Sequence, residues 1–429
     1  MSALTSAGAL RCGGTSGGRA MKCRLLAFSI LTVVVSMVLS PVGAWGAEAP
    51  HVYSWGAAVS TSYKPSLQYF GPAPVDGIPG TVVRISPSNS TSYALTKNGQ
   101  VWAWGSGQHG ALGNGSALPF TSTAVQVKFP TGIKIASLPV PMPYDTGIAI
   151  DTSGNVWGWG FNSEGPLCMT KTNLLYPEQL PLTHVTMASG AGWHALYLSE
   201  QSLYSCGGNA GGELGDGTTT ASESPMRVVG LPDTTIRSIV SSWENSGVVM
   251  ADGSVYDWGF NGAEQLGDGV TTNSDVPVHI GLPAKVVQLS MGGSDTTNGQ
   301  TIALLANGST WAWGSDRFGQ LGTGRVTVGS PPVKVAVPAG TSFVQVRSGG
   351  SSMYAIDRSG AVWSWGQNEF GELGFGNSRT LTEVPTRVDV NLSCVFATAA
   401  NVEGLRASDA GSTTAGAGHS SQSQLQCGL

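Results

Sequence analysis

The sequence is poor in charged residues. Only 11% of the 429 residues are Asp, Glu, Lys or Arg, less than half of the ~25% found in an average domain. The formal net charge is −5, and the sequence contains no cluster of Lys and Arg. A nucleic-acid-binding protein needs such a basic patch, so we expect no nucleic-acid partner.

Motifs for metals, nucleotides and covalent catalysis are also missing. The six His residues are scattered, without the spacing of a metal site. No Asp-x-Asp-x-Asp run indicates calcium, no Gly-x-x-x-x-Gly-Lys loop indicates a nucleotide, and no Gly-x-Ser-x-Gly elbow occurs beyond residue 50. We therefore predict no catalytic, cofactor-binding or metal-binding residues, and a chain that is not an enzyme.

Glycine and tryptophan, by contrast, are abundant. The chain has 61 Gly and 13 Trp, and 41% of its residues are hydrophobic. Gly at about twice its usual ~7% share favours short strands joined by tight turns over long helices. This composition predicts one large β-domain with a sizeable core.

The first 47 residues have the features of a leader. A short basic stretch begins at Met21, an apolar run follows from Leu25 to Leu39, and small residues come next. This order is typical of a secretory signal peptide, and we expect cleavage after Ala44 or Ala47. The run is shorter than the ~20 residues that span a bilayer. We predict extra sequence over 1–20, a signal peptide over 21–47, secretion, and no permanent membrane anchor.

A repeat unit fills most of the remaining chain. Its anchor is a Trp-Gly pair, replaced once by Cys-Gly, and successive anchors are 47 to 55 residues apart. The anchor residues are Trp55, Trp104, Trp159, Cys206, Trp258, Trp313 and Trp365. Their place in the repeat assigns these side chains to the core rather than to a functional site.

Each unit has about four short strands. A hairpin with a turn such as Asn98-Gly99 ends on the anchor, a Gly-Glu/Gln-Leu-Gly loop follows, and a Pro opens another strand. Such sheets cover their faces by stacking around an axis. We therefore predict an all-β fold, a seven-bladed β-propeller with four-stranded blades over 51–412 and a tail over 413–429. The N-terminal strand, near Val52, should close the ring by joining C-terminal strands near Leu405.

Four cysteines remain after the leader: Cys168, Cys206, Cys394 and Cys427. An even number in an oxidising compartment favours disulfides, although four cysteines allow three pairings. Cys206 replaces an anchor Trp and Cys168 lies in the loop of the preceding copy. A disulfide between adjacent blades is one hypothesis, with Cys394 and Cys427 then paired; free buried thiols are the alternative.

The loops after the anchors form the candidate binding face, because equivalent loops of all blades emerge on one side of a propeller. Acidic residues in these loops could bind a basic or amide-rich protein partner, or they could simply be solvated turn residues. The candidate residues are Glu213, Asp216, Glu264, Asp268, Asp316, Arg317, Phe318, Glu369, Phe370 and Glu372.

The units resemble the repeats of the regulator of chromosome condensation family over roughly residues 51–412. The resemblance rests on the Trp-Gly anchor, the Gly-Glu/Gln-Leu-Gly loop and the later Pro-x-x-Val, and it implies a seven-bladed propeller. The third copy departs from it by reading Gly165-Pro166-Leu167-Cys168. The family includes an exchange factor for a small GTPase, an ultraviolet photoreceptor that uses a tryptophan cluster, and a secreted β-lactamase inhibitor. A secreted chain would not meet the GTPase, and we interpret Trp193 and Trp243 as two scattered residues rather than such a cluster.

These observations predict an extracellular, monomeric, non-catalytic scaffold of the secreted bacterial type that binds a protein still to be identified. Two alternatives remain open: an inhibitor of a secreted enzyme and a glycan-active propeller enzyme. The enzyme would need two carboxylates close together on one propeller face.

Overall fold

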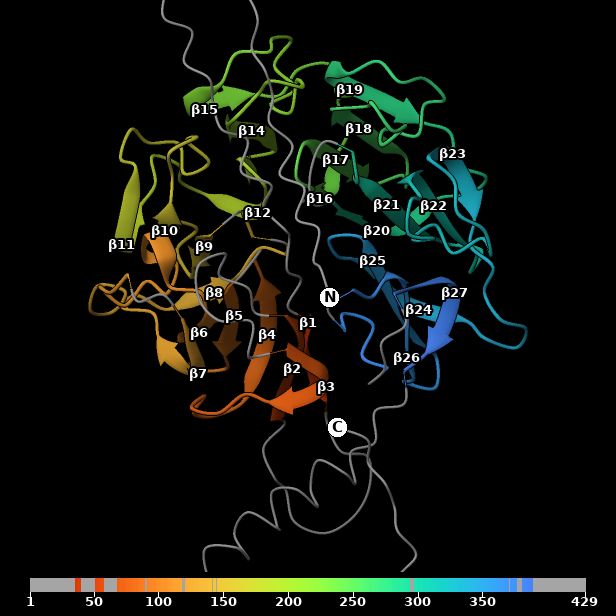
Figure 1. Ribbon diagram of the computed structural model, residues 1–429. Helices are drawn as coiled ribbons and strands as arrows, with labels where there is room; N and C mark the ends of the chain where they lie inside the picture. The colour runs from red at the N-terminus through yellow and green to blue at the C-terminus, as the bar shows by residue number, and fades with distance from the viewer. Residues whose placement is uncertain are drawn as a thin grey trace, which may run out of the picture. The chain divides into compact units, whose positions relative to one another are not determined.

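The computed structural model describes residues 35–39, 51–57, 68–88, 91–117, 120–140, 142–143, 145–293, 297–369, 371–375 and 380–388. These residues form antiparallel sheets of short strands (Figure 1). A single helical turn, η1 (Gln108–Gly110), is described. Among the described residues, no helix has the length and apolarity needed to cross a membrane.

Six of the sheets have four strands each, hydrogen-bonded in sequence order. The first three sheets contain β4 (Val82–Pro87), β5 (Thr91–Thr96), β6 (Val101–Gly105) and β7 (Thr121–Gln126); β8 (Ile135–Ser137), β9 (Thr146–Asp151), β10 (Val156–Phe161) and β11 (Asn173–Gln179); and β12 (Val185–Ala191), β13 (His194–Ser199), β14 (Ser202–Gly207) and β15 (Ser222–Arg227). The next three contain β16 (Ile236–Ser241), β17 (Asn245–Met250), β18 (Val255–Gly259) and β19 (Ser274–Ile280); β20 (Val286–Gly292), β21 (Gln300–Leu305), β22 (Thr310–Ser315) and β23 (Gly329–Lys334); and β24 (Phe343–Ser348), β25 (Ser352–Asp357), β26 (Val362–Gln367) and β27 (Leu381–Arg387).

The first strand of each four-stranded sheet is the innermost. Strand β12 contacts β16, β16 contacts β20, and β20 contacts β24, whereas the fourth strands lie at the periphery (Figure 1). The sheets are therefore the blades of a β-propeller. Each blade covers a face of its neighbour, which leaves the innermost strands around the axis.

The predicted number of four-stranded blades is wrong. The described residues form six, and their remaining sheet has three strands, β1 (Val35–Leu39), β2 (His51–Ala57) and β3 (Gln68–Pro74). Strand β2 pairs with β1 on one edge and β3 on the other. The predicted closure of β2 against C-terminal strands is therefore also wrong, because β1 occupies that edge. The predicted C-terminal strands near Leu405 and the tail over 413–429 lie outside the described residues.

The anchor tryptophans fill the space between blades. Trp159, Trp258, Trp313 and Trp365 are 0% exposed and Trp104 is 5% exposed, so these five side chains are buried. The Trp159 indole N–H donates to the Ala111 carbonyl of the preceding blade at 3.0 Å, and Trp258 and Trp365 donate in the same way to Glu213 and Gln320 at 2.9 Å. Each such bond locks a loop of one blade onto the core of the next.

The glycine of each Leu-Gly loop makes room for the next anchor. A Cβ at Gly113, Gly215, Gly267 or Gly322 would lie within 2.5 to 2.8 Å of an atom of the following Trp ring. These glycines also have positive φ, such as 67° at Gly322, where other residues are strained. Gly and Trp therefore form a matched pair across each of these blade boundaries.

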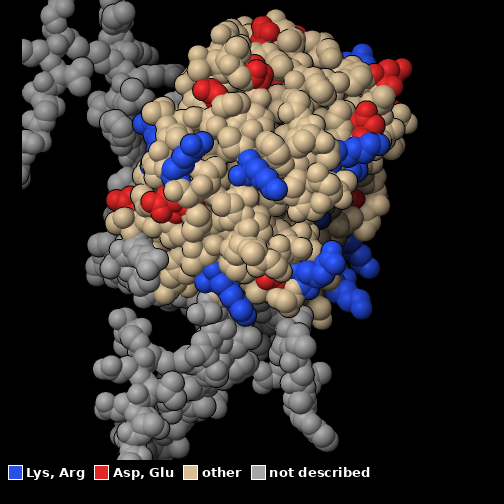
Figure 2. Space-filling model, turned by 90° about the vertical axis from the view of Figure 1, so that its right-hand side faces the viewer, with Lys and Arg blue, Asp and Glu red and all other residues tan. Residues whose placement is uncertain are grey.

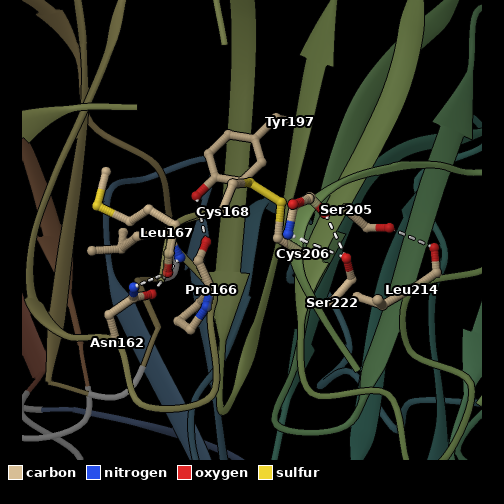
Figure 3. The surroundings of a disulfide bond; sticks show 11 residues. Asn162, Pro166, Leu167, Cys168, Tyr197, Ser205, Cys206, Leu214 and Ser222 are labelled. Atoms are coloured by element: carbon tan, nitrogen blue, oxygen red, sulfur yellow. Dashed lines mark hydrogen bonds between the residues drawn. A yellow bond between two sulfur atoms is a disulfide. The ribbon is translucent and has the colours of Figure 1, made fainter. Parts of the chain in front are cut away.

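At one boundary this pair is replaced by a disulfide (Figure 3). Cys168, with φ 52°, stands in the glycine position, and Cys206, 0% exposed, stands in the anchor position. Their Cα atoms are 5.3 Å apart, within the normal range for a disulfide. The predicted bond between adjacent blades is thus present, while Cys394 and Cys427 lie outside the described residues.

Tyr197 completes the replacement. It is fully buried on β13, at a strand position that holds Ala149 and Ala303 in other blades. Its hydroxyl donates to the Pro166 carbonyl at 2.7 Å, and Pro166 precedes its loop leucine just as Ala111 and Gln320 precede theirs. A tyrosine O–H has therefore taken over the acceptor that an indole N–H uses elsewhere.

Asp257 is a second departure from the repeat. Two other four-stranded blades have serine here, and Ser205 and Ser364 donate to the carbonyls of Leu214 and Leu373 at 2.7 and 2.8 Å. Asp257 is 0% exposed, and desolvation raises the pKa of its carboxyl well above the ordinary value. The blade thus contains a buried acid that is costly to ionise.

Replacing Asp257 with serine should stabilise the protein increasingly as the pH rises. The pKa of Asp257 is raised in the folded state only. The contribution of the protonated acid to the free energy of unfolding is therefore fully present below about pH 4, and it is lost as the pH rises through the folded-state pKa. We expect the melting temperature of Asp257→Ser, relative to wild type, to be higher at pH 8 than at pH 4.5 by roughly 2–4 °C. Thermal unfolding at both pH values checks this, with the exposed Asp233→Ser as control; a pH-independent difference would contradict it.

Candidate binding face

Two kinds of loop lie together at one end of each blade. One joins the first and second strands, and the other follows the Trp-Gly strand. Backbone hydrogen bonds link the two, for example from Gly208 N–H to the Trp193 carbonyl at 3.0 Å and from Phe260 N–H to the Glu244 carbonyl at 2.9 Å. We call the surface that these loops form the loop face.

The repeat motif residues brace these loops from within. The Asn209 side chain accepts from Leu214 N–H at 2.8 Å and donates to the carbonyls of Thr218 and Thr220 at 3.0 Å. Asn261 makes the equivalent bonds in the blade that follows. A side-chain amide at this position therefore fixes both ends of the long loop.

Three of the predicted face residues belong to this bracing. Glu213 is 4% exposed and its carboxylate accepts from Gly211 N–H at 2.9 Å; Asp316 is 0% exposed and accepts from Leu321 N–H at 2.9 Å; Glu372 is 3% exposed. Burial raises the pKa of both Glu213 and Asp316. The structure thus places these three inside the loops, where they cannot contact a partner directly.

The other predicted residues are distributed unevenly. Arg317 and Glu369 are exposed, whereas Asp216, Glu264, Asp268 and Phe318 are half-buried. Asp216 accepts from Thr218 N–H at 3.0 Å, and Asp268 accepts from the Asn261 amide at 3.0 Å. Phe370 lies outside the described residues. The acidic character of the face is therefore weaker than the sequence indicates.

The more distinctive feature is a row of half-buried rings, His109, Phe161, Trp193 and Trp243. The centroids of His109 and Phe161 are 5.1 Å apart, those of Phe161 and Trp193 are 5.6 Å apart, and those of Trp193 and Trp243 are 5.4 Å apart. Each residue comes from a different blade. We call these four residues the aromatic row.

The backbone beneath the row is held in unusual conformations. His109 has φ 56° in η1, and its Nδ1 lies 3.3 Å from the carboxylate of buried Asp145, which has φ 43°. A Cβ on Gly192 would lie 2.1 Å from the Trp243 carbonyl, so only glycine lets these adjacent loops approach so closely. Positive φ at non-glycine residues occurs preferentially at functional positions.

The interpretation of Trp193 and Trp243 as scattered residues is wrong, since their rings are in contact. They are 50 residues apart, but both lie between the first and second strands of consecutive units. Equivalent loops of neighbouring blades are adjacent in a ring. The shared position of the two tryptophans in the repeat was therefore the sequence signal that their side chains lie close together.

The described residues do not assemble a catalytic set. His194 lies 2.8 Å from Ser246, but both are buried, the Ser246 hydroxyl donates to the Glu213 carbonyl at 2.8 Å, and burial lowers the pKa of His194 to about 4. The buried pair is structural. The negative charge of Asp268 contributes to the raised pKa of Asp257, but no substrate reaches buried Asp257. Groups of three or more metal-ligating residues are absent from the described ranges.

The side of the outer surface seen in Figure 2 shows no field of one sign. In Figure 2, acidic and basic side chains are interspersed among large uncharged areas on the side that is visible. A small cavity of about 250 Å³ lies elsewhere, between Asp252, His279 and Lys285. Neither feature competes with the aromatic row as a recognition site.

Comparison with known proteins agrees with this architecture. Models of the regulator of chromosome condensation (RCC1) repeat match residues 82–111, 98–140, 200–249, 252–297, 307–356 and 359–420. The ultraviolet-B receptor UVR8 of Arabidopsis thaliana is 28% identical over 306 residues, which cover 69% of this chain and 68% of the receptor. The human E3 ubiquitin-protein ligase HERC2 is 27% identical over 294 residues, which cover 65% of this chain but only 6% of the ligase.

Among solved structures, Prp20p of Saccharomyces cerevisiae superposes with a TM-score of 0.67 at 21% identity, covering 81% of this chain and 87% of Prp20p. This likeness concerns the fold. The repeat matches together extend over more than half of the sequence. The chain therefore belongs to the regulator of chromosome condensation (RCC1) repeat family.

Proposed function

We propose that this chain is a non-catalytic scaffold that binds a protein partner through the aromatic row of its loop face. The row carries the proposal, because amphipathic rings held on a rigid framework are the commonest anchors of protein interfaces. Its members are neither fully buried, like the anchor tryptophans, nor isolated. Their mutual contacts restrict the rings before a partner arrives, which lowers the entropy lost on binding.

Relatives of the same fold support a binding role. Yeast RCC1 (Prp20) has been crystallised bound to Kap60, and Prp20p has been studied for binding to Gsp1p and histones. The exposed carboxylate of Glu369 and the half-buried ones of Asp216, Glu264 and Asp268 would favour a partner with basic groups at the contact. We further propose that the protein acts as a monomer and binds no nucleic acid.

We also propose that the protein is secreted after removal of residues up to Ala44 or Ala47. Cleavage at either place would remove β1 and leave one edge of β2 without that partner. Sequencing the N-terminus of protein recovered from culture supernatant tests this proposal. Full-length chain retained in the cell would overturn secretion without affecting the binding proposal.

Substituting the two tryptophans of the row should abolish partner capture. We expect the mature chain to retain a defined protein from culture supernatant or host extract, and the Trp193→Ala/Trp243→Ala double variant to retain at least about tenfold less, since interface tryptophans often contribute 2 kcal/mol or more. The matched control is Trp311→Ala. Trp311 is also half-buried, but its indole donates to Ser309 at 3.1 Å in a turn outside the row.

Captured material must be identified by mass spectrometry and its affinity remeasured with the purified partner. Equal affinity for wild type, the double variant and the Trp311 control would show that the row is not the binding site. A catalytic turnover by the purified mature chain on any candidate partner would contradict the non-catalytic part of the proposal.

A further inference from the structure

A cavity of about 250 Å³ lies at the end of the β16–β19 blade that is opposite to the loop face. Its walls are the turn between β17 and β18, the end of β19 and the connection from β19 to β20. The volume is below the roughly 300–1,000 Å³ of pockets that hold drug-sized ligands. The cavity therefore suits a small molecule, and it does not compete with the aromatic row for a protein partner. We call it the turn-end cavity.

The backbone fixes the walls of the turn-end cavity. Val286 N–H donates to the Gly253 carbonyl at 2.9 Å, which ties the connection to the turn. Gly253 has φ 88°, and a Cβ on it would lie 2.6 Å from the Lys285 Cβ, so glycine permits this close approach. Leu282 and Ala284 are half-buried and pack against the hydrophobic core of the blade boundary. The cavity is thus formed before a ligand arrives, which lowers the entropy lost on binding.

The lining combines an apolar floor with a polar rim. Val255 and Ile280 are 0% and 2% exposed and form the floor. Asp252, His279 and Lys285 also line the cavity, and all three are exposed. Within the described part of the chain, no carboxylate forms an ion pair with His279 or Lys285. The rim therefore offers a carboxylate, an imidazole and an ammonium group to a ligand.

The turn does not need the negative charge of Asp252. The Asp252 Oδ1 accepts from Ser254 N–H at 2.9 Å and from the Ser254 hydroxyl at 2.7 Å. In the next blade, the Asn307 Oδ1 accepts from Ser309 N–H at 3.0 Å and from the Ser309 hydroxyl at 2.7 Å. A neutral amide thus forms the same turn. The hydrogen bonds from Ser254, and to a smaller extent the charge of Lys285, lower the pKa of Asp252, which keeps its carboxylate ionised at neutral pH.

The two nitrogen groups reach the cavity from different walls. His279 lies on β19, where its ring packs against that of Tyr256 with centroids 5.3 Å apart and an interplanar angle of 61°. Lys285 lies in the connection, beside Gly253 of the turn. Imidazole and ammonium groups can both donate hydrogen bonds to a carboxylate. One ligand carboxylate can therefore bind both groups, while the acid of the rim remains for a cationic group.

We infer that the turn-end cavity binds a free aliphatic α-amino acid. The ligand ammonium would bind the carboxylate of Asp252, and the ligand carboxylate would accept from Lys285 and His279. The alkyl side chain would cover Val255 and Ile280, which removes apolar surface from water. A simple aliphatic carboxylate would be repelled by Asp252, and a simple amine by Lys285. Because the cavity lies at the other end of the blade, the inference is independent of the partner proposed for the loop face.

Isothermal titration of the full chain with L-leucine tests the inference. We expect saturable binding of one leucine per chain, weakened at least about tenfold in Asp252→Asn and in Lys285→Met, because each variant loses one charge-assisted hydrogen bond. The Asp252→Asn variant copies the turn of Asn307, so its fold should be retained. Equal thermal unfolding of wild type and this variant would confirm that any loss of affinity is local.

Lys134→Met is the matched control. Lys134 is exposed, and a Cβ on Gly99 would lie 3.2 Å from its Cβ, so it stands beside its turn as Lys285 stands beside Gly253. The turn next to Lys134 carries Asn98 in place of an acid. This variant should bind leucine like wild type.

Two analogues separate the contributions of the charged groups. Isocaproate is leucine without its amine, and isoamylamine is leucine without its carboxyl group. Each should bind at least about tenfold more weakly than leucine, because each leaves one side of the rim without its partner. Absence of saturable leucine binding, equal affinities in the cavity and control variants, or an analogue that binds as tightly as leucine would overturn the inference.

Discussion

Removing the Cys168–Cys206 disulfide by the Cys168→Ala/Cys206→Ala double substitution should lower the free energy of unfolding by about 4 kcal/mol. The bond spans 38 residues, and closing a loop of this length in the unfolded chain accounts for a value of that size. The boundary also lacks an anchor Trp, so the alanines would leave a cavity that adds to the loss. Urea unfolding with and without reductant checks this, because reductant should destabilise wild type but not the variant.

The repeat itself supplies the control. Converting the boundary to the pattern of the other blades requires three changes. Cys168→Gly restores the glycine that makes room for the anchor ring, Cys206→Trp restores the anchor indole, and Tyr197→Ala restores the small residue beside it. We expect this triple variant to recover most of the lost stability and to be insensitive to reductant. Cys206→Trp alone should be the least stable of the set, because the indole would overlap Tyr197 and Cys168. A triple variant no more stable than Cys206→Trp would contradict the equivalence of the two boundary designs.

Substituting an anchor tryptophan with alanine should lower the free energy of unfolding by about 3–5 kcal/mol, the usual range for replacing a large buried aromatic side chain with alanine. Trp365 is the best test. It is 0% exposed, stacks on Phe343 with centroids 6.0 Å apart, and donates to the Gln320 carbonyl of the preceding blade. Trp365→Ala would therefore open a cavity and leave a loop carbonyl without its donor.

Trp363→Ala is the matched control for this prediction, since Trp363 lies two residues earlier on the same strand but is only half-buried. Its indole donates to Asp357 at 2.9 Å, so its loss should cost less, about 1–2 kcal/mol. Chemical denaturation of the three proteins gives the comparison. Similar losses for the two tryptophans would show that the Trp-Gly anchors do not hold the blades together.

The anchors were predictable because their role repeats. Trp258 and Trp365 are 107 residues apart, yet both close a hairpin of the same pattern, and a strand with that pattern has one buried face. The same reasoning located Cys168 and Cys206 at a blade boundary. It did not reveal Tyr197, because the hydroxyl that replaces an indole N–H is recognised only once the shared acceptor, the carbonyl before the loop leucine, is known.

Residue type alone did not separate bracing acids from accessible ones. Glu213 and Glu264 are both loop glutamates, but Glu213 immediately precedes the loop leucine, where its carboxylate turns inward to accept a backbone N–H, and Glu264 lies one position earlier and is half-buried. The number of four-stranded blades was mispredicted for a different reason. The apolar residues Val35–Leu39 were assigned wholly to a leader, whereas the same β-branched pattern also suits a strand, and β1 pairs with β2.

We propose above that partners bind the loop face at the aromatic row. Hydrogen–deuterium exchange of the mature chain, free and bound to its captured partner, tests this most directly. We predict slower exchange on binding in the loops around His109, Phe161, Trp193 and Trp243, with no change in the hairpin turns at 97–99, 200–201 and 252–253 at the other end of the blades. Protection of those turns, with the row unchanged, would contradict the claim.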